Sequence, residues 1–192
     1  LVILRSTVPV GTCRNTVAPI LEKSSGMSAG SDFFLAFAPE RTVEGKALEE
    51  LRQLPQVVGG FDPASVQMTT NLMRELTTTI VEVESLEAAE MIKLINNSYR
   101  DLSFAFANQV ALISRHWNLD ANAVIRSANE GYPRNPVPVP SPGVGGICLK
   151  KDPYIFSAVA QEAGISEPLP LSGRKVNEEM PRYVADVFLQ FL

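Results

Sequence analysis

The residues of this chain best suited to covalent chemistry lie in a glycine-rich stretch from Gly143 to Tyr154. Cys148 follows three glycines, which leave the backbone free to adopt a positive φ or to approach a ligand closely. Pro153 suits the first turn of a helix, and Asp152 is placed to cap it. We therefore predict that Cys148 lies on a loop before a helix N-terminus, where amide dipoles favour a thiolate. A small buried thiol in an ordinary turn is the alternative that this stretch leaves open.

A lysine and an asparagine lie four residues apart on a predicted helix. Lys93 and Asn97 therefore point from one face of it. Together they could stabilise an oxyanion by charge and hydrogen bonding. Because most helical lysines are surface residues, the residues alone favour a solvated lysine beside a polar interruption of an apolar stripe.

Polar residues also follow two of the predicted strands. Thr7 ends the first strand, and Glu40 and Glu44 follow the second. Ligands of open parallel sheets bind at such strand ends, although solvation is the alternative for isolated loop acids. The one histidine, His116, has no cysteines or carboxylates at metal-ligand spacing, so we predict no metal site.

Composition excludes several classes of protein. The 192 residues carry a net charge of −4, which argues against a nucleic-acid binder. No apolar run approaches a membrane span, so no membrane partner is expected. Cys13 and Cys148 are far apart and form no disulfide framework, which favours a cytoplasmic location. The chain begins with an apolar strand and no leader, so we interpret it as a piece of a longer protein.

Strand-like and helical runs alternate over residues 1–84. Helices are expected over Thr12–Lys23 and, with Asp62 as the cap, from Pro63 to about Leu76. This alternation predicts βαβ units and a parallel sheet. The expected strands are Leu1–Arg5, Phe33–Ala38, Gln56–Gly60 and Thr79–Val83.

The pattern changes to helical from Ser85. Residues 85–117 contain no proline or glycine, and the apolar spacing predicts one helix about 50 Å long. Its apolar residues cover more than one face, so we expect it to be buried between two domains or two subunits. Residues 131–142 are expected to form an irregular loop. Further helices are expected over Asp120–Asn129, Tyr154–Ala163 and Arg174–Leu192, with Pro181 breaking or kinking the last.

Four segments, in their order along the chain, closely resemble the UDP-glucose/GDP-mannose dehydrogenase family of nucleotide-sugar 6-dehydrogenases. They are Ser6–Thr12, Ala38–Gly45, Ala89–Arg100 and Gly143–Pro153. Their form is more similar to the branch that oxidises UDP-N-acetylmannosamine or UDP-N-acetylglucosamine. Ile147 departs from that branch, which usually has a histidine before the cysteine, and Leu149-Lys150-Lys151 departs from its usual run.

The resemblance implies a fold and a domain plan. Residues 1–84 would be the C-terminal part of an NAD-binding Rossmann domain, and residues 85–192 the helical central domain. The expected fold class is α/β, with a partial Rossmann-like parallel sheet followed by an all-helical domain whose long helix makes a homodimer. The family's Gly-x-Gly-x-x-Gly loop and its nucleotide-sugar domain are absent from this sequence. We therefore do not expect these 192 residues to catalyse the reaction by themselves.

The resemblance also implies a reaction, the oxidation of a UDP-sugar (or GDP-sugar) C6 alcohol to a carboxylate with two NAD⁺. Cys148 would capture the aldehyde as a thiohemiacetal and then carry a thioester. Lys93 would stabilise the oxyanion, helped by Asn97. The remaining catalytic residues would position water or assist proton transfer near the thioester. They are Asp152, Thr7 and Glu40.

The same resemblance implies binding residues. Thr7, Glu44 and Lys151 would lie near NAD, with Lys151 suited to its phosphates. Lys93 and Asn97 would contact the sugar as well. Gly145 would let the backbone approach the sugar, and Arg134 is a candidate sugar or phosphate contact. The intact protein would be a cytoplasmic enzyme of polysaccharide or envelope biosynthesis.

Two alternatives stay open at this point. The chain could be a non-catalytic dimerisation module that keeps the fold without the activity. It could also be a dehydrogenase of the 6-phosphogluconate or 3-hydroxyacyl type, which shares the plan of a Rossmann domain and a long helix. Neither alternative needs Cys148 as a nucleophile.

Overall fold

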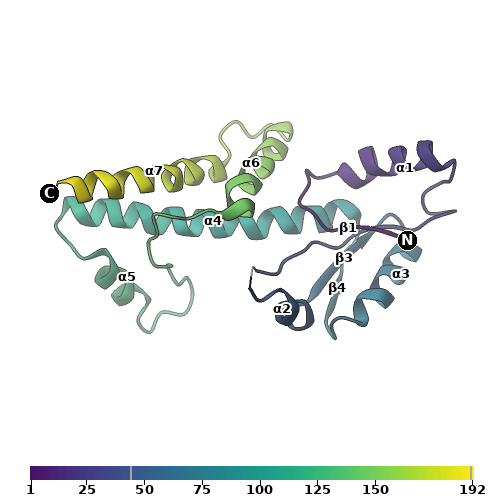
Figure 1. The fold of residues 1–192 in the computed structure, drawn as a ribbon, viewed down its shortest axis with the longest axis horizontal. Helices are drawn as coiled ribbons and strands as arrows, with labels where there is room; N and C mark the ends of the chain where they lie inside the picture. The colour runs from purple at the N-terminus through teal and green to yellow at the C-terminus, as the bar shows by residue number, and fades with distance from the viewer. Residues whose placement is uncertain (44, 191) are drawn as a thin grey trace. The chain divides into compact units, whose positions relative to one another are not determined.

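The computed structural model describes residues 1–43, 45–190 and 192 and divides the chain into two compact units. The first runs from Leu1 to Leu94 and the second from Ile95 to Leu192. The division falls inside the long helix α4, Leu86–His116 (Figure 1). Each unit therefore packs its other elements on its own part of that helix.

The first unit is built on a four-stranded sheet in the order β1-β2-β3-β4. Its core joins Cys13, Phe37 and Val57 to Leu86 and Ala89 of α4, all of them buried. The strands are β1 Val2–Leu4, β2 Leu35–Phe37, β3 Gln56–Gly60 and β4 Ile80–Glu82. Besides α4, the helices are a π-helical turn Cys13–Val17, α1 Ala18–Ser25, α2 Ala47–Gln53 and α3 Pro63–Arg74.

The predicted α/β fold class is confirmed, with a sheet followed by a helical unit and one long helix, but the sheet is mixed where a parallel one was predicted. β1 pairs with β2 and β3 with β4 in parallel, as the βαβ pattern predicts, but β2 and β3 are antiparallel. The reason is that a short buried strand has the same apolar sequence pattern whether it pairs with its neighbour in parallel or antiparallel. Strand positions were therefore predictable here, and one strand direction was not.

Helix α3 forms where the local signals placed it. Asp62 has extended backbone geometry and its carboxylate accepts a hydrogen bond from the Ser65 N–H at 2.7 Å. Pro63 occupies the first turn, where its missing N–H costs nothing. This confirms the predicted cap, and the helix ends at Arg74, close to the expected end.

The second unit is helical. It holds α5 Ala121–Asn129, α6 Gly146–Glu162 and α7 Leu169–Leu189 beside the later part of α4 (Figure 1). A Cβ at Gly173 would lie 2.7 Å from Leu102, so the glycine allows α7 to pack closely on α4. Asp120 caps α5 by accepting from two backbone N–H groups, and the helix lies in the predicted range 120–129.

Two helix predictions need correction in this unit. Helix α6 begins at Gly146, eight residues before the predicted start, so Cys148 lies within its first turn and Asp152 is not its cap. Pro153 lies inside the helix. Helix α7 begins at Leu169, before the predicted start, and it continues through Pro181, which does not break it. Among the described residues, none of the helices is both long enough and apolar enough to cross a membrane.

Candidate active site

Cys148 lies on an exposed helix start. Gly145 is the N-cap of α6 and Gly146 has φ of +75°, a conformation that glycine adopts without strain. Cys148 is the third residue of the helix and its side chain is exposed. The first four N–H groups of a helix have no partner within it and favour negative charge nearby. Cys148 therefore lies on a helix turn and not on the predicted loop, and its role as a nucleophile stays a prediction.

Asp152 is the centre of a buried polar cluster beside this turn. Its side chain is fully buried, and it follows Cys148 by one helical turn, so the two lie on neighbouring positions of one face. The Asn97 amide nitrogen donates to one oxygen of the carboxylate, and the Lys151 ammonium lies 2.6 Å from the other. The structure thus brings together three of the predicted site residues, one from α4 and two from α6.

In the first unit, Thr7 and Glu40 follow the neighbouring parallel strands β1 and β2. The Glu40 N–H donates to the Arg5 carbonyl at 3.1 Å, which joins the two strand ends. The Glu40 carboxylate accepts from the Arg5 guanidinium at 2.8 Å and from the Thr42 N–H at 2.8 Å. Partial burial raises the pKa of Glu40, but the Thr42 and Arg5 contacts outweigh it and leave the pKa below its ordinary value. Glu40 is therefore a fixed carboxylate that accepts hydrogen bonds.

Lys93 is buried in the first unit. Only 8% of the residue is exposed, and its ammonium donates to the backbone carbonyl of Glu40. This corrects the interpretation of a solvated lysine that the residues alone favoured. The physical reason is that the α4 face carrying Lys93 packs against the segment after β2, which the helix pattern by itself does not reveal.

The remaining predicted binding residues have different settings. Gly145 is the helix cap, and a Cβ there would lie 2.8 Å from the Lys150 side chain. Arg134 is exposed and lines a groove of about 460 Å³, and its guanidinium carbon lies 5.8 Å from the centroid of the Tyr132 ring. Glu44 lies outside the described residues. Lys151 is occupied by Asp152, so a phosphate would have to compete for its ammonium.

Sequence reasoning missed Glu90, a fully buried acid on α4. Its carboxylate accepts from the Gly11 N–H at 2.6 Å and from the Cys13 N–H at 2.8 Å, at the start of the helix that follows β1. The signal was available, because Glu90 lies one turn from Leu86 and Leu94, both fully buried. Burial and the contact with Glu90 raise the pKa of the Cys13 thiol, so Cys13 stays protonated and packed.

A second missed residue is Arg174 on α7, which is 1% exposed. Its guanidinium pairs with Asp101 of α4 at 2.5 Å and donates to the carbonyls of Val144 and Leu149, on either side of Cys148. A lone arginine in an amphipathic helix carries no pattern that marks it as buried.

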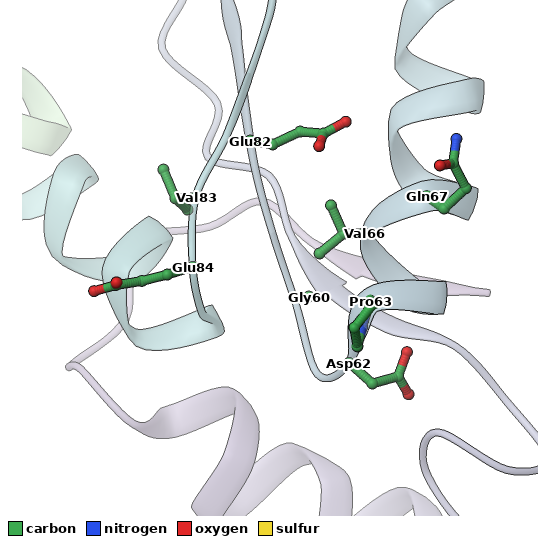
Figure 2. A pocket seen from close by; sticks show the side chains of 8 residues that line it. All are labelled: Gly60, Asp62, Pro63, Val66, Gln67, Glu82, Val83 and Glu84. Atoms are coloured by element: carbon green, nitrogen blue, oxygen red, sulfur yellow. The ribbon is translucent and has the colours of Figure 1, made fainter.

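A hollow of about 420 Å³ lies in the first unit beside the start of α3 (Figure 2). Its charged side chains are Asp62, Glu82 and Glu84, and its lining contains no lysine or arginine. It therefore does not suit a phosphate group, and it contains none of the predicted site residues. In the described part of the chain, His, Cys, Asp and Glu side chains form no group of three that could hold a metal ion.

Two parts of the chain match one protein family. Residues 1–77 match the NAD binding domain of the UDP-glucose/GDP-mannose dehydrogenase family, and residues 87–179 match its central domain. A UDP-N-acetyl-D-mannosamine dehydrogenase from Pyrococcus horikoshii is 34% identical over 192 residues, which are 100% of this chain and 45% of that protein. A UDP-N-acetyl-D-glucosamine 6-dehydrogenase from Pseudomonas aeruginosa is 34% identical over 185 residues, 96% of this chain and 43% of that protein.

The fold agrees with these matches. The solved structure of UDP-D-ManNAc dehydrogenase from Pyrococcus horikoshii superimposes with a TM-score of 0.90 at 34% identity, covering 99% of this chain and 44% of that one. The chain therefore spans less than half the length of the curated relatives it matches. The match of residues 1–77 to an NAD binding domain confirms that NAD is the expected cofactor.

Proposed function

This chain belongs to the UDP-glucose/GDP-mannose dehydrogenase family, and we propose that the intact enzyme oxidises the C6 alcohol of a nucleotide sugar to a carboxylate with NAD⁺. The names of the relatives support a UDP-N-acetylhexosamine as the substrate class. Ile147 and the residues after Cys148 depart from the acetylhexosamine pattern, so the proposal names a substrate class and not one sugar. The observation that carries the proposal is the polar cluster of Asn97, Lys151 and Asp152 one turn from Cys148.

The strand ends of the first unit fit the cofactor. Open α/β sheets bind ligands beyond the carboxyl ends of their strands, and Thr7 and Glu40 follow two parallel strands there. The helix start at Gly11 is already filled by the Glu90 carboxylate, so the cofactor phosphates must use other donors. Lys151 and Glu44 are the proposed further contacts. NAD⁺, when bound, accepts a hydride in each of the two oxidations.

Cys148 is the proposed nucleophile. Its sulfur adds to the C6 aldehyde to give a thiohemiacetal, and after the second oxidation the same sulfur carries a thioester. Attack by water on the acyl carbon breaks the carbon–sulfur bond and releases the carboxylate and the thiolate. Support comes from the exposure of Cys148 and from its place in the first helical turn, whose amides have no partner within the helix.

Lys93 and Asn97 are proposed to stabilise the oxyanion that forms at C6. A buried ammonium is worth more to a developing negative charge than a solvated one, because the surroundings screen it less. Lys93 is buried and held by the Glu40 carbonyl, which keeps its charge at a fixed place. Asn97 is held by Asp152, which orients its amide.

Asp152, Thr7 and Glu40 are proposed to guide the hydrolytic water and its proton. Two of them are carboxylates with fixed partners, so their lone pairs are oriented before a substrate arrives. A carboxylate within reach of the thioester can accept a proton from water as it attacks the acyl carbon. Gly145 and Arg134 are the proposed further contacts to the nucleotide sugar.

A homodimer through α4 is the proposed assembly. Ile95, Tyr99 and Phe106 on this helix are large and exposed, with 48%, 71% and 57% of each residue accessible. An apolar groove of about 360 Å³ runs between Ile95, Tyr99 and the segment before α7. A second copy of the helix would cover these side chains. Cys13 and Cys148 are free thiols, which supports a cytoplasmic location.

The test counts NADH released per sugar oxidised by the intact enzyme. The proposal predicts two, and a Cys148→Ser variant should lose the complete oxidation while the Cys13→Ser variant, the matched control, keeps it. One NADH per sugar would contradict the four-electron reaction. A Cys148→Ser variant with undiminished product would favour the 6-phosphogluconate or 3-hydroxyacyl type, and no oxidation by the intact wild-type protein would favour a non-catalytic module.

A further inference from the structure

The helix turn that carries Cys148 has a backbone carbonyl without its usual partner. In an α-helix the Leu149 carbonyl would accept from the N–H of residue 153. Position 153 is proline, which has no N–H, and it lies inside α6. The Arg174 guanidinium supplies the missing donor at 3.2 Å from the Leu149 oxygen.

The same guanidinium holds the other side of the turn. Its second terminal nitrogen donates to the Val144 carbonyl at 3.0 Å. Val144 and Leu149 lie on either side of the segment 145–148, which contains the helix cap, the positive-φ glycine and Cys148. The rigid, planar guanidinium of Arg174 therefore binds the backbone at both ends of this short segment.

Arg174 is itself fixed by buried partners. Asp101 of α4 accepts from it at 2.5 Å, and the Asn177 amide donates to the Asp101 carboxylate and carbonyl, each at 3.0 Å. Asn108 extends the network, because it donates to Asn177 at 2.8 Å and exchanges two hydrogen bonds with the Ser141 backbone. The segment from Ser141 to Leu149 is thus held by side chains of α4 and α7.

The buried ion pair of Arg174 and Asp101 adds little to the stability of the fold, because both charges lose their hydration. Burial raises the pKa of Asp101 more than the neighbouring Arg174 lowers it. Buried pairs of this kind often contribute no more to stability than apolar residues of similar size. The pair is better explained by the geometry that it imposes on the backbone next to Cys148.

We propose that Arg174 is a positioning residue for Cys148, acting through the carbonyls of Val144 and Leu149. The inference rests on the proposed role of Cys148 as the nucleophile. Arg174 does not touch the reacting atoms. It sets the path of the turn so that the sulfur stays within reach of the C6 carbon, where a displacement of about 1 Å can cost about 10²-fold in rate.

The experiment compares Arg174→Lys with Arg182→Lys in the intact enzyme. Arg182 lies on the same helix and its side chain is 89% exposed, so its variant controls for a change of cation on α7. Lysine keeps the charge beside Asp101 but cannot reach both carbonyls with a planar fork. We expect amide hydrogen exchange at residues 150–152, whose N–H groups donate to the carbonyls of residues 146–148 in an α-helix, to rise at least about tenfold in Arg174→Lys, with α5 unchanged. We expect kcat to fall by about 10²-fold and KM for NAD⁺ to stay within about twofold.

A second variant tests the mechanism directly. Pro153→Ala returns an N–H to the Leu149 carbonyl, so in that background Arg174→Lys should raise exchange and lower kcat by a smaller factor. Equal factors in both backgrounds, or exchange at residues 150–152 no faster than in Arg182→Lys, would overturn the proposal. So would a loss of kcat that only follows a loss of folded protein by circular dichroism. Exchange reports on the turn whatever the reaction is, whereas the Cys148→Ser variant reports on the proposed function, so the two failures are distinguishable.

Discussion

The buried carboxylate of Glu90 is expected to stabilise the start of the helix that follows β1. Its carboxylate is fully buried and accepts from the backbone N–H groups of Gly11 and Cys13, at 2.6 and 2.8 Å. These donors begin the helix that follows β1, and Thr7 lies on the segment between them and the strand. A Glu90→Gln change keeps the size and one acceptor oxygen, but it places an amide NH₂ against the second N–H.

The expected cost follows from these contacts. Losing one hydrogen bond to a charged group in a buried site costs about 1.5–3 kcal/mol. Losing a negative charge at a helix N-terminus costs about a further 0.3–1 kcal/mol. We therefore expect Glu90→Gln to lower the free energy of unfolding of the first unit by about 2–4 kcal/mol. Amide exchange at Gly11 and Cys13 should then rise by roughly 30- to 10³-fold.

The matched control is Glu87→Gln, one helical turn earlier on α4. Glu87 pairs with Arg14 at 2.7 Å, but both side chains are partly exposed, so this variant should cost less than about 1 kcal/mol. Urea unfolding and native-state hydrogen exchange of the intact protein measure both variants. If Glu90→Gln costs no more than Glu87→Gln, the carboxylate does not hold this helix start, and the reasoning is refuted.

Two further predictions concern charged groups. Asp101→Asn removes the fully buried carboxylate from Arg174 and leaves the guanidinium only the half-exposed Glu178, at 3.3 Å, as a counter-charge. It should destabilise the second unit by about 3 kcal/mol in urea unfolding, against less than about 0.5 kcal/mol for the exposed Asp186→Asn, and equal costs would contradict this prediction. The hydrogen bonds from Arg14 lower the pKa of Glu87, so the stability that this group contributes is complete above the ordinary pKa of glutamate and is lost as the pH falls through the lowered value. Glu87→Gln should therefore flatten the decline of stability at acid pH, and an unchanged slope would contradict the assignment.

Elements that depend on neighbouring residues were predictable from the sequence. The Asp62 cap predicted the start of α3, because a cap bonds within three residues of itself. The start of α5 was predicted at Asp120, which the structure shows to be its cap. The absence of proline and glycine over residues 85–117 predicted α4 almost to its ends. These signals are local and need no knowledge of the rest of the fold.

Features that depend on distant partners were not predictable. Pro153 indicated a helix start, whereas it lies inside α6. The Leu149 carbonyl that it leaves without an N–H partner accepts from Arg174, 25 residues after Leu149 along the chain. Lys93 was expected in solvent, because the Glu40 carbonyl that binds it is 53 residues earlier. Residue type and spacing made Cys148, Lys93 and Asn97 candidates, and the resemblance to a family supplied their roles. Glu90 and Arg174, which bind backbone groups, were found only in the structure.

The central claim is that the Cys148 sulfur carries the substrate between the two oxidations. The most direct measurement is mass spectrometry of the intact enzyme, quenched in acid during turnover of a UDP-sugar and digested to peptides. The account predicts that the Cys148 peptide gains the mass of the acylated sugar nucleotide, while the Cys13 peptide does not. Steady turnover to the carboxylate by an enzyme in which Cys148 is replaced by alanine would contradict it.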